Sequence, residues 1–233
     1  MKYIITSLIV LTSLNLFGQY KPVIFDSLKL YEYEAIFINS KGDTLTKEKI
    51  TIKSMNVPWE FQKSQTKLYY QYFPDSIGLK SFVNPVKKFR KLKFSDLEKF
   101  EETGVIENES SLWMHPFRAN QYVYTQMAPF PEVNFENGKI KKEWLSNRLN
   151  FFSWSSYKGI VKSNYSLGSI INYNLNDQML YNCFEINAEG VHNKLGVSYL
   201  KTIFNKEYGF LEMNYLFYDK TQIKIKLKKV YLN

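Results

Sequence analysis

Residues able to do acid–base or metal chemistry are few in this sequence. The 233 residues include two histidines, His115 and His192, and a single cysteine, Cys183. Two imidazoles and one thiol fall short of the four ligands of common structural zinc sites, and no H-E-x-x-H, G-x-S-x-G or Gly-rich phosphate-loop pattern is present. We therefore expect no metal and no cofactor, and no catalytic residue is indicated by a motif.

One short segment, residues 112–118 (LWMHPFR), combines several groups that could contact a ligand. The proline after His115 restricts the backbone on both sides of it, so the imidazole and the guanidinium of Arg118 would be held on a defined loop. Trp113, His115 and Arg118 are the predicted ligand-binding residues, and Arg118 suits a carboxylate or phosphate. The alternative is structural, with Trp113 and Phe117 plugging the open end of a sheet while His115 satisfies backbone groups.

A pair of carboxylates gives a second candidate site. Glu107 and Glu109 precede Trp113, and glycosidases need two carboxylates about 5–10 Å apart. The alternative is a pair of solvated loop carboxylates. A Ser-His-Asp triad with members distant in sequence also stays open, because triads are defined by geometry rather than spacing.

The first 18 residues have the three parts of a secretory signal peptide: a basic Lys2, an apolar stretch from Tyr3 to Phe17, and a small Gly18. An uncleaved membrane anchor would need roughly 20 apolar residues, more than this stretch offers. We expect a signal peptide at 1–18 and a single β-rich domain at 19–233, exported to the periplasm or secreted. With no Cys near the proposed cut, lipid attachment is not expected, and a lone Cys excludes an intramolecular disulfide.

The charge of the chain narrows its expected partners. The formal net charge is +9, and loss of residues 1–18 removes one lysine and no acidic residue. An exported protein is not expected to bind nucleic acid, so a basic surface predicts an anionic envelope surface as a neighbour. The alternative is a scatter of lysines that keeps the protein soluble. The basic run Lys87–Lys93 fits either interpretation.

Alternating apolar and polar residues predict a mostly β fold, a curved antiparallel sheet or open barrel of about 8–9 strands with one or two short helices. The strands are predicted at residues 28–39, 44–54, 66–73, 157–166, 168–175, 179–188, 195–204, 209–218 and 221–232. The first two flank a Gly-containing turn and form a hairpin. In the last strand the alternation breaks at Lys228-Lys229, which predicts a β-bulge.

The middle of the chain departs from the alternating pattern. Ser95 and Glu98 form a capping box that predicts a short helix over Asp96–Glu102. Aromatic residues and three prolines within 111–132 predict a structured loop over the sheet rather than a central strand. Residues 139–150 have helical character without clear caps.

Two patterns in the C-terminal third carry a family resemblance: Y-x-C-x-E-I-x-A at 181–188 and F-N-x-E-Y-G-F at 204–210, with Gly196 between them. In these the chain resembles uncharacterised exported β-sheet proteins of the cell envelope, and its loops at 113–118 and 129–132 resemble a pattern from such proteins. More distantly it is similar to lipocalin-like and periplasmic lipoprotein-carrier folds. Those folds bind acyl chains or other apolar ligands, and the resemblance implies the same kind of ligand here.

Aromatic residues make up 17% of the chain and gather on single strand faces. Together with the basic surface, they lead to the hypothesis of a non-enzymatic exported protein that binds an apolar or amphipathic ligand, or a lipidated partner, in the concavity of its sheet. Two alternatives are an envelope protein-protein interaction module and a hydrolase. A transmembrane protein is not expected, because the lysines that alternate along the last strand do not suit a lipid-facing barrel.

Overall fold

The computed structural model describes residues 24–74, 98–151 and 159–232. The predicted signal peptide at 1–18 and the basic run at 87–93 lie outside these residues. The described chain forms strands and one 3-10 helix: β1 (Lys29–Ile38), β2 (Thr44–Trp59), β3 (Gln62–Phe73), β4 (Phe100–Glu107), β5 (Ser111–Met114), η3 (Asn120–Met127), β6 (Glu132–Glu136), β7 (Lys139–Ile140), β8 (Glu143–Phe151), β9 (Gly159–Leu175), β10 (Gln178–His192), β11 (Gly196–Asn205), β12 (Gly209–Leu216) and β13 (Gln222–Leu232). None of the helical structure seen in these residues is long and apolar enough to span a membrane.

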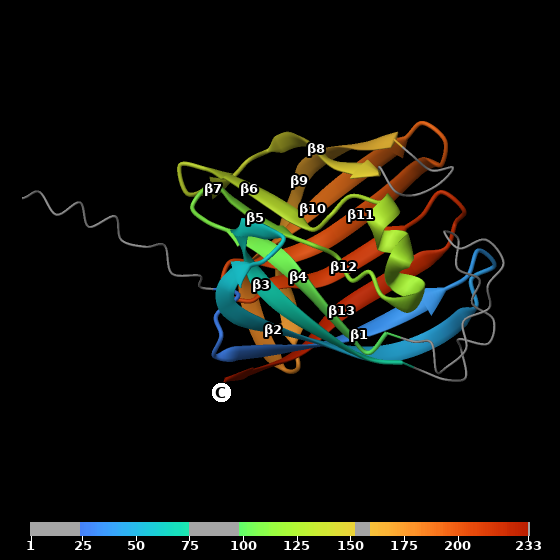
Figure 1. The fold of residues 1–233 in the computed structure, drawn as a ribbon. Helices are drawn as coiled ribbons and strands as arrows, with labels where there is room; N and C mark the ends of the chain where they lie inside the picture. The colour runs from blue at the N-terminus through green and yellow to red at the C-terminus, as the bar shows by residue number, and fades with distance from the viewer. Residues whose placement is uncertain (1–23, 75–97, 152–158, 233) are drawn as a thin grey trace, which may run out of the picture.

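The strands form one 13-stranded sheet in the order β7-β6-β5-β4-β3-β2-β1-β13-β12-β11-β10-β9-β8. The sheet is antiparallel and strongly curved, with one concave face (Figure 1). The first and last strands pair in its middle, where Lys29 lies opposite Leu232. The edge strands β7 and β8 are neighbours in sequence, yet no pairing joins them in the described part of the chain. The predicted mostly β, open antiparallel class is confirmed, but the count of 8–9 strands was wrong.

The strands predicted from strict alternation are present, with the expected faces. In β1, Tyr31, Tyr33 and Ala35 are buried, and β1 pairs with β2 as the predicted hairpin. Apolar side chains on one face of a pleated strand all point into the core, which fixes the register. The bulge in β13 is also confirmed, because Lys229 lies opposite Glu32 and Leu227 opposite Tyr33, which leaves Lys228 as the extra residue.

The middle of the chain was predicted less well. The helix expected over Asp96–Glu102 is absent from its described part, where residues 98 and 99 are irregular and β4 begins at Phe100. Pairing with β3, in which Glu101 lies opposite Tyr70, outweighs the local capping pattern. Strands β5 and β6 form at the two ends of the predicted aromatic loop, and β8 replaces the helical character expected at 139–150. The two strands predicted within 157–175 are one continuous strand, β9.

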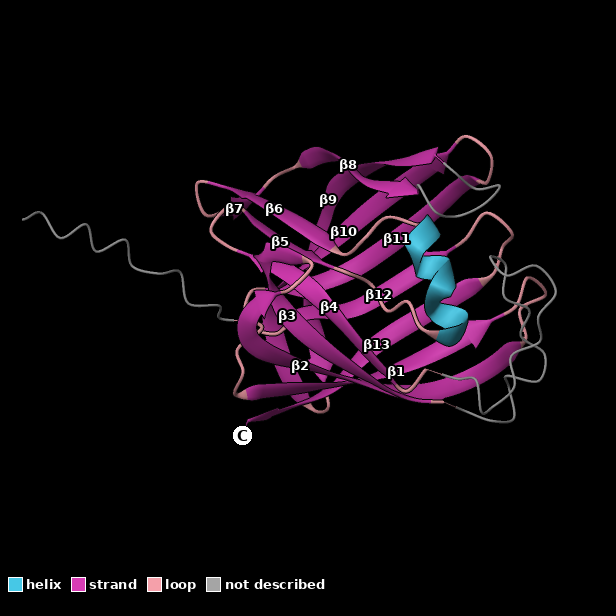
Figure 2. Ribbon diagram, in the orientation of Figure 1, coloured by secondary structure: helices cyan, strands magenta, loops and turns pink. Residues whose placement is uncertain are grey.

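The chain between β5 and β6, residues 115–131, leaves the sheet and packs over its concave face (Figure 2). We call it the inner loop. It contains η3, which lies over the concave face of the curled sheet (Figure 2). All but two of the eight helix residues are buried, and the loop belongs to the same hydrophobic cluster as the inward faces of the strands. The core of the protein therefore lies between the concave face and this loop.

Candidate functional site

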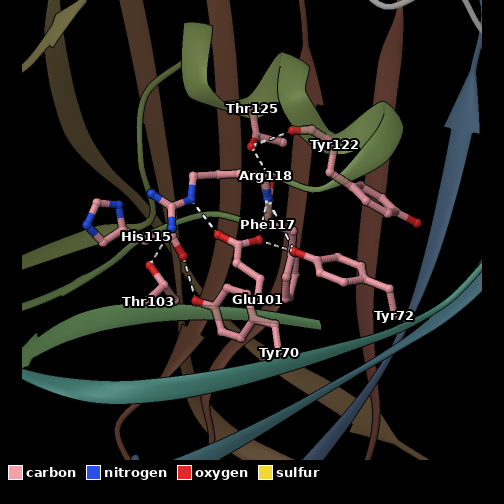
Figure 3. Close-up of polar contacts among 9 residues, drawn as sticks. All are labelled: Tyr70, Tyr72, Glu101, Thr103, His115, Phe117, Arg118, Tyr122 and Thr125. Carbon is pink, nitrogen blue, oxygen red and sulfur yellow. Dashed lines mark hydrogen bonds and ion pairs between the residues drawn. The ribbon is translucent and has the colours of Figure 1, made fainter. Parts of the chain in front are cut away.

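A charged contact ties the inner loop to the sheet. Arg118 donates from Nε to Glu101 Oε1 at 2.5 Å and from its backbone N–H to Glu101 Oε2 at 3.1 Å. Its Nη2 donates to Thr103 Oγ1 at 3.0 Å, and Tyr72 donates from its hydroxyl to Glu101 Oε2 at 2.5 Å. Figure 3 shows the guanidinium of Arg118 directed at β4 beneath the loop. Because Glu101 is only 10% exposed at its side chain, losing either charge would leave the other poorly solvated.

Aromatic packing surrounds this ion pair. Phe117 is fully buried and lies with its ring centroid 4.8 Å from that of Tyr70. The Tyr70 hydroxyl donates to the carbonyl of His115 at 2.6 Å, and the Tyr122 hydroxyl donates to Glu48 Oε2 at 2.8 Å. Burial away from water raises the pKa of Tyr70 and Tyr122 well above the usual value. These hydroxyls therefore act as neutral donors that hold the loop.

His115 lies in an aromatic environment. Its ring centroid is 4.5 Å from that of Trp113, 5.4 Å from that of Trp59 and 5.7 Å from that of Phe130. Neither ring nitrogen has a hydrogen-bond partner among the described residues. Burial, and secondarily the charge of Arg118, lower the pKa of His115 to about 3. The imidazole is neutral at physiological pH, and the expectation that it satisfies backbone groups was wrong for its side chain.

The three predicted ligand-binding residues lie close together where β5 joins the inner loop, with Trp113 in β5 and His115 and Arg118 in the loop. Trp113 is 5% exposed and stacks on Phe130 at 5.6 Å, whereas the guanidinium of Arg118 contacts Glu101 and Thr103. Neither of the two hollows described next is lined by Trp113, His115 or Arg118. Their arrangement is that of residues that pack and fasten the inner loop.

The smaller hollow has a volume of about 230 Å³ and includes Glu107 and Glu109 in its lining. Glu107 accepts hydrogen bonds from the backbone N–H groups of Ile24 and Phe25 at 2.9 and 3.0 Å. Its carboxylate therefore fastens the described N-terminal end of the chain, while Glu109 is exposed. Trp113 does not line this hollow, whose aromatic lining is Phe135 and Phe204, so the tryptophan expected beside the carboxylate pair lies elsewhere.

The larger hollow is a groove of about 770 Å³ against β8, β9, β10 and β11, which we call the β8–β11 groove. Its lining is Glu143, Trp144, Leu145, Asn164, Tyr165, Ser166, Asn187, Ala188, Glu189 and Tyr199. Leu145 is 74% exposed and Tyr199 is 45% exposed. The groove therefore combines apolar surface with amide, hydroxyl and carboxylate groups.

Strand pairing explains how these side chains come together. Leu145 lies opposite Asn164, Asn164 opposite Glu189, and Glu189 opposite Tyr199. Residues directly opposite each other point to the same face, so these four form a row across the outer face, about 4.8 Å apart from strand to strand. A second row, of Glu143, Ser166 and Asn187, runs beside it two residues along each strand.

The wall of the β8–β11 groove is fixed to the core. Trp144 stacks on Tyr165 with centroids 5.0 Å apart and rings tilted by 7°. The hydroxyl of Tyr165 donates to the carbonyl of Phe130 in the inner loop at 2.8 Å. The edge strand β8 is thereby held against the interior, and the groove is preformed.

Sequence reasoning missed the groove for two reasons. Residues 139–150 were given helical character, so Leu145 could not be placed on a strand face. Tyr199 lies on the same outer face of its strand as the exposed Lys201. An aromatic residue on such a solvent-facing side could have indicated a binding surface.

No protein-family model matches this chain, and no curated protein sequence matches it significantly. Among solved structures, similarity extends to a protein from Bacteroides fragilis, described as a candidate exported protein with a YmcC-like fold (TM-score 0.42, 8% identity, 89% of this chain and 97% of that chain). It extends also to a candidate lipoprotein from Parabacteroides distasonis (TM-score 0.46, 8% identity, 89% and 96%). A third is a β-barrel-like protein of the domain of unknown function DUF1849 from Brucella abortus (TM-score 0.44, 6% identity, 88% and 97%).

These descriptions agree with the resemblance to exported β-sheet proteins of the cell envelope that the sequence predicted. At 8% identity or less, the likeness concerns the fold alone. Within the described ranges, no group of three or more His, Cys, Asp or Glu side chains is arranged to hold a metal ion.

Proposed function

We propose that this protein is an exported, non-enzymatic binding protein that takes an amphipathic ligand in the β8–β11 groove. The observation that carries the proposal is the groove itself, about 770 Å³ in volume, with exposed Leu145 and Tyr199 set among polar side chains. Ligand pockets commonly have volumes of 300–1,000 Å³ and apolar linings with a few placed polar groups.

The proposal moves the binding site away from the concavity expected from the sequence. Phe117, Tyr122 and Met127 of the inner loop occupy that face and are at most 2% exposed. A ligand entering there would have to displace a buried part of the core. The outer groove needs no such rearrangement, because its wall is fixed by the stacked pair Trp144 and Tyr165.

Fluorescence of the neutral apolar probe N-phenyl-1-naphthylamine tests this proposal. The unmodified protein should give a saturable increase with one class of site. Leu145→Ser should weaken probe binding about tenfold, because it removes the most exposed large apolar side chain of the lining. Ile170→Ser is the matched control, since Ile170 is 63% exposed on β9 but does not line the groove. Absence of saturable binding, or equal losses in both variants, would count against the groove.

A further inference from the structure

We infer that the β8–β11 groove selects amphiphiles that carry a primary amine, although the protein as a whole is strongly basic. This inference rests on the proposed function and names the ligand class for the same groove. Two carboxylates lie in the groove lining, those of Glu143 and Glu189, and none of the described residues that line the groove is a lysine or arginine. A ligand with an apolar body and a cationic group would match both kinds of surface.

Both carboxylates lack an ion-pair partner in the described chain. Lys201 on β11 forms an ion pair with Glu185 at 2.5 Å. Glu185 lies on the same strand as Glu189, so this lysine is paired with a glutamate outside the groove. Lys162 on β9 is near in register, since it lies opposite Val191, yet it forms no ion pair within 4.0 Å of either groove carboxylate. The negative charge of the groove is therefore available to a bound cation.

This local charge contrasts with its surroundings. Elsewhere on the sheet, partly exposed glutamates have ion-pair partners: Glu212 on β12 lies 3.6 Å from Lys226, and Glu34 on β1 lies 3.0 Å from Lys47. With a net charge of +9 over the chain, a cation approaching at random is repelled. A groove whose charged side chains all have one sign, and whose walls have a low dielectric constant, concentrates the electric field within it. A cation is therefore attracted to the groove and repelled by the rest of the surface.

Spacing indicates how such a ligand would lie. Glu143 and Glu189 are two strands apart and on rows offset by two residues, which puts their backbone positions about 12 Å apart on the face. Leu145 lies beside Glu143, and Tyr199 lies beside Glu189. An amine placed at either carboxylate leaves its alkyl chain over Leu145 or Tyr199, and the tyrosine ring adds a cation–π contact.

Displacement of N-phenyl-1-naphthylamine by decylamine, decanol and decanoate at low ionic strength tests the inference, because the three share one alkyl chain and differ in charge. Decylamine should compete about fivefold better than decanol, since one ion pair of this kind changes affinity by about that factor. Decanoate should compete worst, because its carboxylate is repelled by the two groove carboxylates. Raising the salt concentration should reduce the advantage of the amine. Glu143→Gln and Glu189→Gln should each lower decylamine affinity and leave decanol affinity unchanged.

Glu109→Gln supplies the matched control, because it makes the same change of charge at an exposed glutamate outside the groove. Equal competition by decanol and decylamine, or equal effects of the groove and control substitutions, would overturn the amine preference while leaving the groove as a binding site. Failure of every amphiphile to displace the probe, or of the probe to bind, would overturn the proposed function as well.

Discussion

At the scale of single residues, burial separates charged groups that fasten the structure from those that face water. Glu101 and Glu102 are adjacent in β4, but alternation sends them to opposite faces. The side chain of Glu101 is 10% exposed beneath the inner loop, whereas that of Glu102 is 53% exposed and pairs with Lys67. The same contrast makes His115 a neutral packing residue rather than a titrating one.

Substitution of the two neighbouring glutamates should therefore have unequal effects. Glu101→Gln is expected to lower the free energy of unfolding by about 2–3 kcal/mol, because it leaves Arg118 partly buried without its counter-charge. Glu102→Gln should change it by no more than about 0.5 kcal/mol. Urea denaturation at neutral pH measures both, and equal losses would show that the ion pair does not hold the inner loop.

The lowered pKa of His115 predicts a dependence of stability on pH. The unfolded imidazole has the ordinary pKa of 6.5 and the folded one a pKa of about 3, so between these values the unfolded chain binds a proton that the folded protein excludes. Stability from this residue is complete above pH 6.5 and is lost as the pH falls, by about 1.4 kcal/mol per pH unit.

Comparison with His115→Phe isolates that contribution. Between pH 6.5 and 5 the unmodified protein should lose about 2 kcal/mol more unfolding free energy than the variant, a range in which few carboxylates titrate. Denaturant melts at four pH values would measure the difference. Parallel pH profiles for the two proteins would contradict the neutral, buried imidazole.

At the scale of elements, the sequence predicted the strands correctly wherever one face of a strand is buried and the other is exposed to solvent. Strands β1, β11, β12 and β13 were placed within a few residues, and the bulge at Lys228 was located. The secondary structure of residues 111–136 could not be predicted, since β5 and β6 are short strands on either side of a buried loop. Prolines and aromatic residues are compatible both with a loop and with a buried strand at the edge of a sheet. Strand β4 was not predicted, because the capping box just before it favoured a helix. The pairing of β4 with β3 is a long-range contact that a local sequence pattern cannot show.

The contact between the inner loop and β10 can be tested at Gly190. A Cβ there would lie 2.9 Å from Pro129 Cδ and 3.1 Å from Val161 Cγ1, so Gly190→Ala should cost about 1–3 kcal/mol through overpacking. Gly168→Ala is the comparison variant, because its Cβ would lie 3.1 Å from Asn187 Nδ2, 3.2 Å from Glu185 Cβ and 3.4 Å from the Glu185 carbonyl oxygen, none of which belongs to the inner loop. Thermal melts compare them, and a neutral or stabilising Gly190→Ala would place the loop farther from β10.

At the scale of the whole molecule, one hydrophobic cluster joins all the long strands to the inner loop. The candidate site was predicted least well at this scale. His115 and Arg118 lie on a defined loop, as predicted, and Trp113 lies in β5 just before it. Whether these side chains face a ligand or the core depends on how far the sheet curls. The β8–β11 groove likewise arises only when four strands are laid side by side.

A single cluster predicts cooperative unfolding. Far-ultraviolet circular dichroism, which follows the sheet, and tryptophan fluorescence, which follows the four tryptophans of the chain, should give coincident urea transitions. Two separated transitions would indicate that β8–β11 and the inner loop unfold independently.

The pairing of β1 with β13 has a consequence for the order of folding. Strand β1 has one partner, β2, within a few residues, but its pairing with β13 must wait until the intervening strands have been made. Until then the middle of the sheet presents two unpaired edges rich in aromatic residues, which are prone to aggregate. The middle of the sheet is thus completed only when β13 has paired, and a holding chaperone would be of most use to the chain before that step.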